Sequence, residues 1–390
     1  MHPHPPRGAG RPRFEVGDIV RAHGDELLAQ RPLRPEQARA LSAMALCRTA
    51  ALGGHLDRCD GCDFTRPAYN SCRNRHCPKC QSLAQERWIH SRAERVLPVG
   101  HFHVVFTVPR ELRALVAFRR KELLGELMRA AGHTLTELGN SRLNATLGVT
   151  AVLHTWTRTL LFHPHVHCLV TAGGLASDAD RWIARDEFLF PVRVIGDLFR
   201  GKLLGAIRRL HREGTFDGFA AFRDPEGFER LMRRLAKHRW VVYSKQPFAT
   251  SEHLFRYLGR YTHRVGIANS RLLDVGPNHV TFRTKDGRSE TLSSSEFLRR
   301  LVQHILPPGF VKIRHYGLYA GTHVRKGLEQ ARALLPSSTT TAPPLPPTWF
   351  DLLAALVGNH VRLCPACGGE VHPEPLLQPH ASARAPPPPR

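Results

Sequence analysis

The chain has 390 residues, with 56 lysine and arginine residues against 33 aspartate and glutamate residues, so its formal net charge is +23. At roughly 100 to 200 residues per domain, this length indicates two or three domains. An apolar content of 42% excludes wholesale disorder. No apolar run long enough for a membrane span or a secretion signal occurs, so we expect a cytoplasmic protein without a membrane partner.

The excess of positive charge favours a polyanionic partner. Nucleic acid is the commonest such partner, because lysine and arginine displace the counterions condensed on phosphates. A general bias of the source proteome toward arginine is the alternative explanation. In a reducing compartment, close pairs among the nine cysteines more often hold a metal ion than form disulfides.

The predicted elements alternate between helices and strands. Residues before 35 read as a loose lead, and a helix with proline in its first turn follows. Apolar and β-branched spacing then predicts the remaining elements. They are helices at 35–48, 111–138, 197–211, 251–264 and 294–306, strands at 101–108, 146–156, 165–171 and 240–243, and a hairpin at 271–284.

Composition divides the chain into three parts. Residues 1–90 contain the first cysteine pairs and form a small N-terminal module, and residues 95–335 carry the mixed α and β elements. Residues 336–390 begin with a Ser/Thr/Pro linker at 336–347, continue through a further cysteine pair, and end in a Pro-rich tail from 373 with too few apolar residues to pack.

Two closely spaced cysteine pairs mark the N-terminal module. Cys59-x-x-Cys62 and Cys77-x-x-Cys80 have the arrangement of two knuckles that converge on one tetrahedral, structural zinc ion. Nearby Cys72, His76 and His55 are alternate ligands. Four buried free thiols are the competing interpretation. Arg73, Arg75 and Lys79 surround the second knuckle and could contact a phosphate backbone.

A third pair, Cys364-x-x-Cys367, supplies only half of a zinc site. His360 and His372 could complete a second site, and an accessory role without a ligand is an equal alternative.

Three histidines occupy every second position of one predicted strand. His163, His165 and His167 therefore project from the same face, where two imidazoles can chelate one divalent cation and leave positions for a phosphate oxygen. The third ligand would be His154 or His163, with His101 and His103 behind them. A partly exposed polar face of an edge strand is the alternative. The spacing does not choose between a transition metal and Mg²⁺ or Mn²⁺.

The predicted helix at 251–264 combines tyrosines with arginines. Tyr257 and Tyr261 share one face. A basic stripe suited to phosphate runs beside them, made of Arg256, Arg260 and Arg264 with His263. An ordinary amphipathic core helix would show similar spacing.

Together these motifs resemble one known family. They are Cys72-Arg-Asn-Arg-His-Cys77-Pro-Lys-Cys80-Gln81, His154-Thr-Trp156, His163-Pro-His-Val-His167 and Tyr257-Leu-Gly-Arg-Tyr-Thr-His-Arg264. The chain resembles, over residues 39–319, the rolling-circle insertion-sequence transposases of the HUH endonuclease superfamily, two-tyrosine type, which also carry an N-terminal transposase zinc-binding domain.

The resemblance implies an α+β fold, with a zinc-binding, DNA-recognition module followed by a nuclease domain whose central antiparallel sheet is flanked by helices. It implies that His165 and His167 hold the catalytic divalent ion, Mg²⁺ or Mn²⁺. Tyr257 or Tyr261 would then attack single-stranded DNA at the element's ends, forming a 5′-phosphotyrosine and a 3′-OH for rolling-circle strand transfer into target DNA. The expected setting is the nucleoid, with host replication proteins as further candidate partners.

Two other functions remain in competition with a transposase. A plasmid-type replication initiator or relaxase uses the same chemistry at a different DNA origin. A zinc-dependent DNA-binding remnant of a transposase would retain the basic surface and the zinc but lack catalysis.

Overall fold

The computed structural model describes residues 12–30, 32–80, 96–187, 189–224, 226–248, 266–285, 287–321, 324–335, 348, 351–352, 354 and 359–377. Among the helices in these ranges, none is both long and apolar enough to cross a membrane.

A six-stranded sheet forms the largest part of the molecule. Its strands run in the order β11-β4-β5-β3-β7, with β6 beside β5, and every neighbouring pair is antiparallel. The strands are β3 (His101–Thr107), β4 (Ala145–Trp156), β5 (Phe162–Ala176), β6 (Trp182–Ala184), β7 (Val242–Phe248) and β11 (Ile313–Gly317). The prediction of a mixed fold around a central antiparallel sheet is confirmed.

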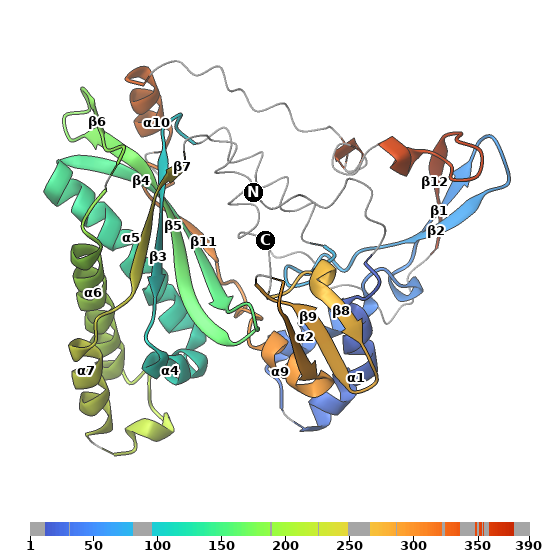
Figure 1. The fold of residues 1–390 in the computed structure, drawn as a ribbon, viewed down its shortest axis with the longest axis horizontal. Coiled ribbons are helices and arrows are strands. Elements are labelled where there is room, and N and C mark those ends of the chain that lie inside the picture. Colours follow the sequence, from blue (N-terminus) through green and yellow to red (C-terminus); the bar gives the residue numbers. More distant parts are fainter. Residues whose placement is uncertain are drawn as a thin grey trace.

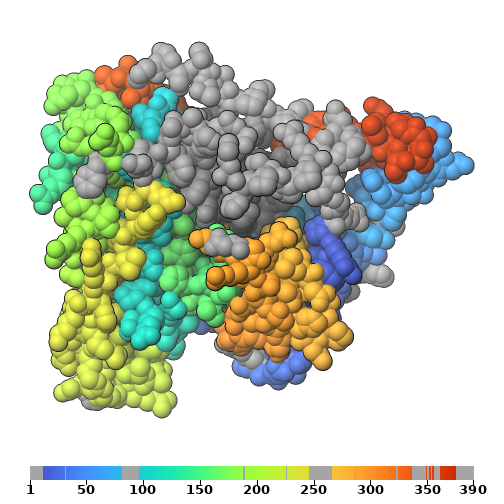
Figure 2. Space-filling model, in the orientation of Figure 1, coloured from blue at the N-terminus to red at the C-terminus, as the bar shows by residue number. Residues whose placement is uncertain are grey.

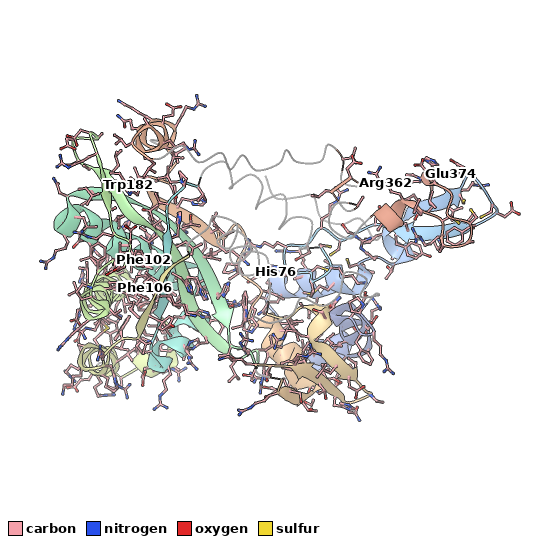
Figure 3. All side chains as sticks on the ribbon, turned by 45° about the horizontal axis from the view of Figure 1, so that its top comes forward. His76, Phe102, Phe106, Trp182, Arg362 and Glu374 are labelled. Atoms are coloured by element: carbon pink, nitrogen blue, oxygen red, sulfur yellow. The ribbon has the colours of Figure 1, made fainter. Side chains whose placement is uncertain are left out.

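Helices cover one face of this sheet (Figure 1). They are α4 (Arg113–Phe118), α5 (Arg120–Leu143), α6 (Val192–Arg212) and α7 (Gly227–Lys237), with short 3₁₀ turns at Arg110–Leu112 and Ala220–Phe222. Alternate strand residues such as Phe102, Phe106 and Val166 enter the core between sheet and helices, where Phe106 packs on Phe199 of α6 (Figure 3). This alternation turns the intervening residues, including the histidines, toward the opposite face.

The predicted helices have different bounds in the structure: those expected at 35–48 and 294–306 end at Leu46 and Val302, and two others differ as follows. The helix expected at 111–138 is interrupted at Arg119, whose φ of −117° and ψ of 68° are not helical, so that α4 ends there and α5 begins at the next residue. The helix expected from 197 begins already at Val192, because Ile195 and neighbouring side chains pack against the sheet. Helix α7 and strand β11 were not predicted.

A second core joins the N-terminal region to residues 267–305. Helices α1 (Val16–Gln30) and α2 (Pro35–Leu46) pack against a hairpin sheet and one further helix. These partners are β8 (Leu272–Val275), β9 (His279–Arg283), β10 (Ser289–Ser293) and α9 (Ser294–Val302), with 3₁₀ turns at Ala50–Leu52 and Asn269–Arg271. The packing therefore crosses the boundary that composition suggested near residue 90.

Helix α1 corrects the expectation of a loose N-terminal lead. Val16, Ile19 and Leu27 are buried along one side of this helix. They lie in the same core as Phe282 and Phe297, whose rings pack edge to face at 5.9 Å. The helix is stable because residues far along the chain cover its apolar side, which a local pattern does not reveal.

A third unit is a three-stranded sheet in the order β12-β1-β2, which lies at the right of Figure 1. It consists of β1 (Gly54–Cys59), β2 (Thr65–Tyr69) and β12 (Val371–Leu377). The expectation that residues from 373 onward do not pack is wrong for 373–377, because they pair with β1.

Two further helical elements are α10 (Val324–Ala333) and a 3₁₀ turn at Asn359–Arg362.

Buried histidines connect the first two units. The ring of His304 donates a hydrogen bond from Nε2 to the carbonyl oxygen of Leu160 (3.0 Å) and accepts one at Nδ1 from the hydroxyl of Thr155 (3.1 Å). His76, which lies between the two units in Figure 3, accepts a hydrogen bond at Nε2 from the backbone N–H of Leu306 (3.0 Å). Both rings are therefore held in their neutral form.

Because His304 is buried in its neutral form at this junction, we expect the free energy of unfolding to fall in acid. Burial lowers the pKa of His304 to about 4, against 6.5 for an exposed histidine, so the unfolded chain binds more protons between these values. Stability is fully present above pH 6.5 and falls toward pH 4, by about 2 kcal/mol at pH 5 for this one residue. Thermal unfolding at pH 8 and pH 5 should show a smaller decrease for His304→Gln than for the unsubstituted chain. Equal decreases would contradict the lowered pKa of His304. Both proteins contain the same cysteine clusters, so the acid sensitivity of these clusters cancels when the two decreases are compared.

Candidate active site and metal centres

Three histidines meet on the sheet face opposite to the helices. His154 of β4 lies directly across from His165 of β5 in the antiparallel register, and His167 follows two positions along β5. One ring nitrogen from each of these residues lies within 4.8 Å of the others. These distances suit three imidazole ligands around one cation.

Hydrogen bonds orient two of the three rings. The Nδ1 atom of His165 donates to the carbonyl oxygen of His163 (2.7 Å), and Nδ1 of His167 pairs with Nε2 of His103 on the neighbouring strand (2.8 Å). Nε2 is therefore the candidate ligand atom of both rings. The ring of His154 stacks on Trp156, with centroids 4.6 Å apart. Such outer partners fix the ring orientation that a metal requires.

The other predicted histidines have different roles. His163 accepts at Nδ1 from the guanidinium of Arg113 (2.6 Å), and it is not part of the three-histidine cluster. His101 lies away from the cluster, where Nδ1 donates to the carbonyl oxygen of Val99 (2.9 Å) and Nε2 pairs with the hydroxyl of Tyr319 (3.0 Å). His103 contacts the cluster from outside through its bond to His167.

The electrostatics of the site favour neutral rings. Burial lowers the pKa of His165 to about 4, and burial together with the neighbouring His165 and His103 lowers the pKa of His167 to about 2. A neutral imidazole is the form that ligates a metal, so the cluster is ready for an ion at physiological pH.

Cationic side chains lie around this face of the sheet. Arg113 contacts His163, and burial followed by the charge of Lys245 lowers the pKa of His103. The amine of Lys312 lies 5.8 Å from the centre of the Trp156 ring, and burial followed by the charge of Arg75 lowers its pKa to about 7. Arg113 and Lys245 thus place positive charge near the histidine cluster, as a site for a phosphodiester requires.

The cysteines form two clusters rather than the one expected from spacing. Cys77 and Cys80 lie with Cys72 and Cys47, whereas Cys59 and Cys62 lie in a separate cluster with the pair Cys364 and Cys367. The prediction that the two N-terminal pairs share one metal is therefore corrected. Each pair lies on its own turn, and each turn packs against a different part of the fold.

The cluster of Cys47, Cys72, Cys77 and Cys80 suits zinc. The Sγ atom of Cys80 lies 3.6 Å from that of Cys47 and 3.6 Å from that of Cys72, and all four sulfurs lie within 4.8 Å of one another. In a tetrahedron with Zn–S bonds of about 2.3 Å, the sulfurs are about 3.8 Å apart. Of the predicted alternates, only Cys72 lies in the cluster.

The remaining predicted zinc-module residues make other contacts. His76 accepts from Leu306 as described, and Nε2 of His55 pairs with the carboxylate of Asp57 at 3.1 Å. Both guanidinium NH groups of Arg75 donate to carbonyl oxygens, those of Phe310 (2.6 Å) and Pro307 (2.8 Å). Lys79 forms an ion pair with Glu15, and Arg73 is exposed. Arg75 therefore connects the N-terminal module to residues 307–310, although its side chain is also partly exposed.

The predicted tyrosine helix lies outside the described residues. This applies to Tyr257 and Tyr261, and to the DNA-contacting candidates Arg256, Arg260, His263 and Arg264. The side chain of His360 also lies outside the described set, whereas His372 pairs with Asp60 at 2.8 Å and is not in a cysteine cluster.

Comparison with known proteins identifies the family of this chain. Residues 148–326 match the family described as "Putative transposase", and residues 19–108 match the "Transposase zinc-binding domain". The chain is 43% identical over 373 residues to "Putative transposase y4qJ" of Sinorhizobium fredii, which covers 90% of this chain and 92% of the relative. The chain belongs to this transposase family.

A second relative is more distant. The transposase is 28% identical over 365 residues to "Transposase for insertion sequence element IS801" of Pseudomonas savastanoi pv. phaseolicola, covering 88% of this chain and 85% of that protein. No solved structure matches the chain. The family resemblance found in the sequence is confirmed, and the zinc-binding domain together with the tetracysteine geometry supports structural zinc in the transposase.

The sequence pattern does not identify one residue of these centres, and it names another only as a reserve ligand. Cys47 follows the end of α2 and has no close cysteine neighbour in the sequence, so no knuckle pattern marks it. His103 was considered only as a reserve ligand. Its alternation with His101 on β3 places both on the histidine face, but the pairing of β3 with β5 decides which of the two reaches His167.

Replacing Cys47 tests the first zinc cluster. Cys47→Ala removes one of the four thiol ligands, so we expect faster zinc transfer to a chromogenic chelator and a melting temperature several degrees lower. Cys168→Ala is the matched control, because Cys168 is equally buried in the sheet core, outside both cysteine clusters. Identical zinc release by the two variants would remove Cys47 from the ligand set.

Proposed function

We propose that the transposase nicks single-stranded DNA at the ends of its element through a tyrosine nucleophile, at a divalent cation held by His154, His165 and His167. The observation that carries the proposal is the meeting of three imidazoles on one sheet face, with the cationic side chains of Arg113 and Lys245 nearby. Family membership supplies the class of reaction, which is transposition of DNA.

The proposed step is a transesterification. The hydroxyl oxygen of Tyr257 or Tyr261 attacks phosphorus, the bond from phosphorus to the 3′ oxygen breaks, and the phenolic proton is transferred to that oxygen. The products are a 5′-phosphotyrosine and a 3′-OH, which can serve rolling-circle strand transfer. When bound, Mg²⁺ or Mn²⁺ would polarise the scissile phosphate and stabilise charge on its oxygens.

The residues of the chain position the phosphodiester. The paired strands β4 and β5 hold the imidazoles, and the bond from His103 fixes the ring of His167. Arg113 and Lys245 lie beside this face and would attract the DNA backbone before any base is read. Because these side chains are held in place before the DNA binds, they can stabilise the charge of the transition state without having to rearrange.

Two alternatives use the same residues differently. A plasmid-type initiator or relaxase would cleave an origin of replication, but both named relatives are transposases, which favours an element end as the substrate. A non-catalytic DNA-binding remnant would not require three histidines to meet.

We further propose that the protein acts at the nucleoid, with host replication proteins supplying strand synthesis from the 3′-OH.

Replacement of the tyrosines tests the nucleophile. Single-stranded DNA carrying the element's terminus, incubated with Mn²⁺, should give a covalent adduct that migrates slowly in a denaturing gel. The double variant Tyr257→Phe, Tyr261→Phe lacks both phenolic oxygens, so the adduct should fall by at least about 100-fold while DNA retention in a gel shift is kept. Equal adduct formation by this variant would exclude both tyrosines.

A matched pair of histidine variants tests the third ligand. His154→Ala should lower Mn²⁺ affinity and adduct yield by more than about tenfold, because one imidazole of the cluster is lost. His163→Ala removes an imidazole from the same face but outside the cluster, so its Mn²⁺ affinity should stay close to that of the unsubstituted protein. Mn²⁺ binding measured by electron paramagnetic resonance separates the two. The opposite ranking would assign the ligand to His163.

A further inference from the structure

We propose that Cys59, Cys62, Cys364 and Cys367 form a second structural zinc site. This site links residues 364–377 of the transposase to the N-terminal arm formed by β1 and β2. The matched zinc-binding domain spans residues 19–108 and thus contains only the first two of these cysteines. The inference is independent of the proposed nicking reaction, which uses none of the four.

The sulfur positions fit one tetrahedral ion. The Sγ atoms of Cys59 and Cys367 lie 3.4 Å apart, those of Cys62 and Cys364 lie 3.7 Å apart, and all four lie within 4.8 Å of one another. A tetrahedron with Zn–S bonds of about 2.3 Å has sulfurs about 3.8 Å apart, whereas a disulfide requires about 2.05 Å. The close approach across both pairs therefore favours four thiolates around a common ion.

Backbone amides point at the sulfurs from both turns. The N–H of Gly61 donates to Sγ of Cys59 (3.3 Å), that of Ala366 to Sγ of Cys364 (3.4 Å), and that of Gly369 to Sγ of Cys367 (3.4 Å). Such hydrogen bonds stabilise the negative thiolate, which is the form that binds zinc. The two turns are thus built alike, although they come from opposite ends of the chain.

Glycine allows the two turns to approach. A Cβ atom on Gly369 would lie 3.3 Å from the sulfurs of both Cys59 and Cys367, and one on Gly61 would lie 3.4 Å from that of Cys367. Gly368 has a φ of +75°, which L side chains rarely adopt, and it turns the chain after Cys367. A Cβ atom at Gly369 would require the neighbouring sulfurs to shift by a few tenths of an ångström.

The sheet β12-β1-β2 carries this site but has little core of its own. Strand β1 ends at Cys59, which pairs with Val371 of β12, and the N–H of Asp60 donates to the carbonyl of Glu370 (3.2 Å). The buried apolar cluster around the sulfurs contains Cys59, Cys364 and Val371, with Cys62 and Phe64 packed against it. A unit this small commonly requires a metal to hold its structure.

The site joins distant parts of the chain. Cys59 and Cys367 are 308 positions apart, and Cys62 and Cys364 are 302 positions apart. Figure 2 shows the C-terminal residues of this unit lying against the N-terminal arm formed by β1 and β2. A cross-link that closes so long a segment restricts the unfolded chain strongly, so zinc here would hold the C-terminal strand in place.

Metal counting by native mass spectrometry tests the proposal on the full-length chain. All proteins carry His165→Ala, so that the histidine cluster does not contribute to the count. We expect two zinc ions per chain, and one after Cys364→Ala, Cys367→Ala. Cys168→Ala is the matched control and should keep two. A count that does not change on removal of Cys364 and Cys367 would overturn the site, as would iron in place of zinc or a disulfide found by alkylation without reductant.

Hydrogen exchange separates loss of this site from general misfolding. In the Cys364→Ala, Cys367→Ala variant, amides of β1 and β12 should exchange at least tenfold faster, while amides of β4 and β5 keep their protection. Cys59→Ala, Cys62→Ala should give the same pattern and the same loss of one zinc ion. Faster exchange in β4 and β5 alone, or unchanged protection of β12, would contradict the proposal.

Discussion

The antiparallel pairing of β4 with β5 is the constraint on which the candidate active site depends. It places His154 opposite His165 and sets His167 two positions along, so three side chains from two strands reach one point. The strands are rigid because their other face is packed against helices through residues such as Val166 and Leu153. A shift of register by one residue would turn the imidazoles of β5 into that core.

The second constraint is how the cysteines are shared between distant segments. The first cluster takes Cys47 from the end of α2 and three cysteines from the loop that follows β2, and this loop also holds Arg75 and His76 against residues 306–310. The segment that carries three of the four clustered cysteines thus also joins the N-terminal module to residues 306–310. The second cluster joins the two ends of the chain in a separate unit.

The sequence alone predicted the parts of the structure that depend on local patterns. Alternation identified β3, β4 and β5 and the outward direction of His165 and His167, and the family resemblance gave the class of protein. Long-range packing explains what was missed. Helix α1 is covered by residues 267–305, and Cys47 lies beside cysteines of a loop more than twenty positions away. The cysteines that lie beside Cys364 and Cys367 are more than 300 positions upstream. The role of Tyr257 and Tyr261 stays a prediction, because they lie outside the described residues.

The most direct test of the histidine centre is a crystal structure of the Tyr257→Phe, Tyr261→Phe variant with Mn²⁺ and single-stranded DNA from the element's terminus, in which anomalous scattering locates the ion. The account predicts an anomalous peak within coordination distance of ring nitrogens from His154, His165 and His167, with the scissile phosphate bound to the same ion and residues 257 and 261 facing it. A peak elsewhere, or a phosphate bound away from these imidazoles, would contradict it.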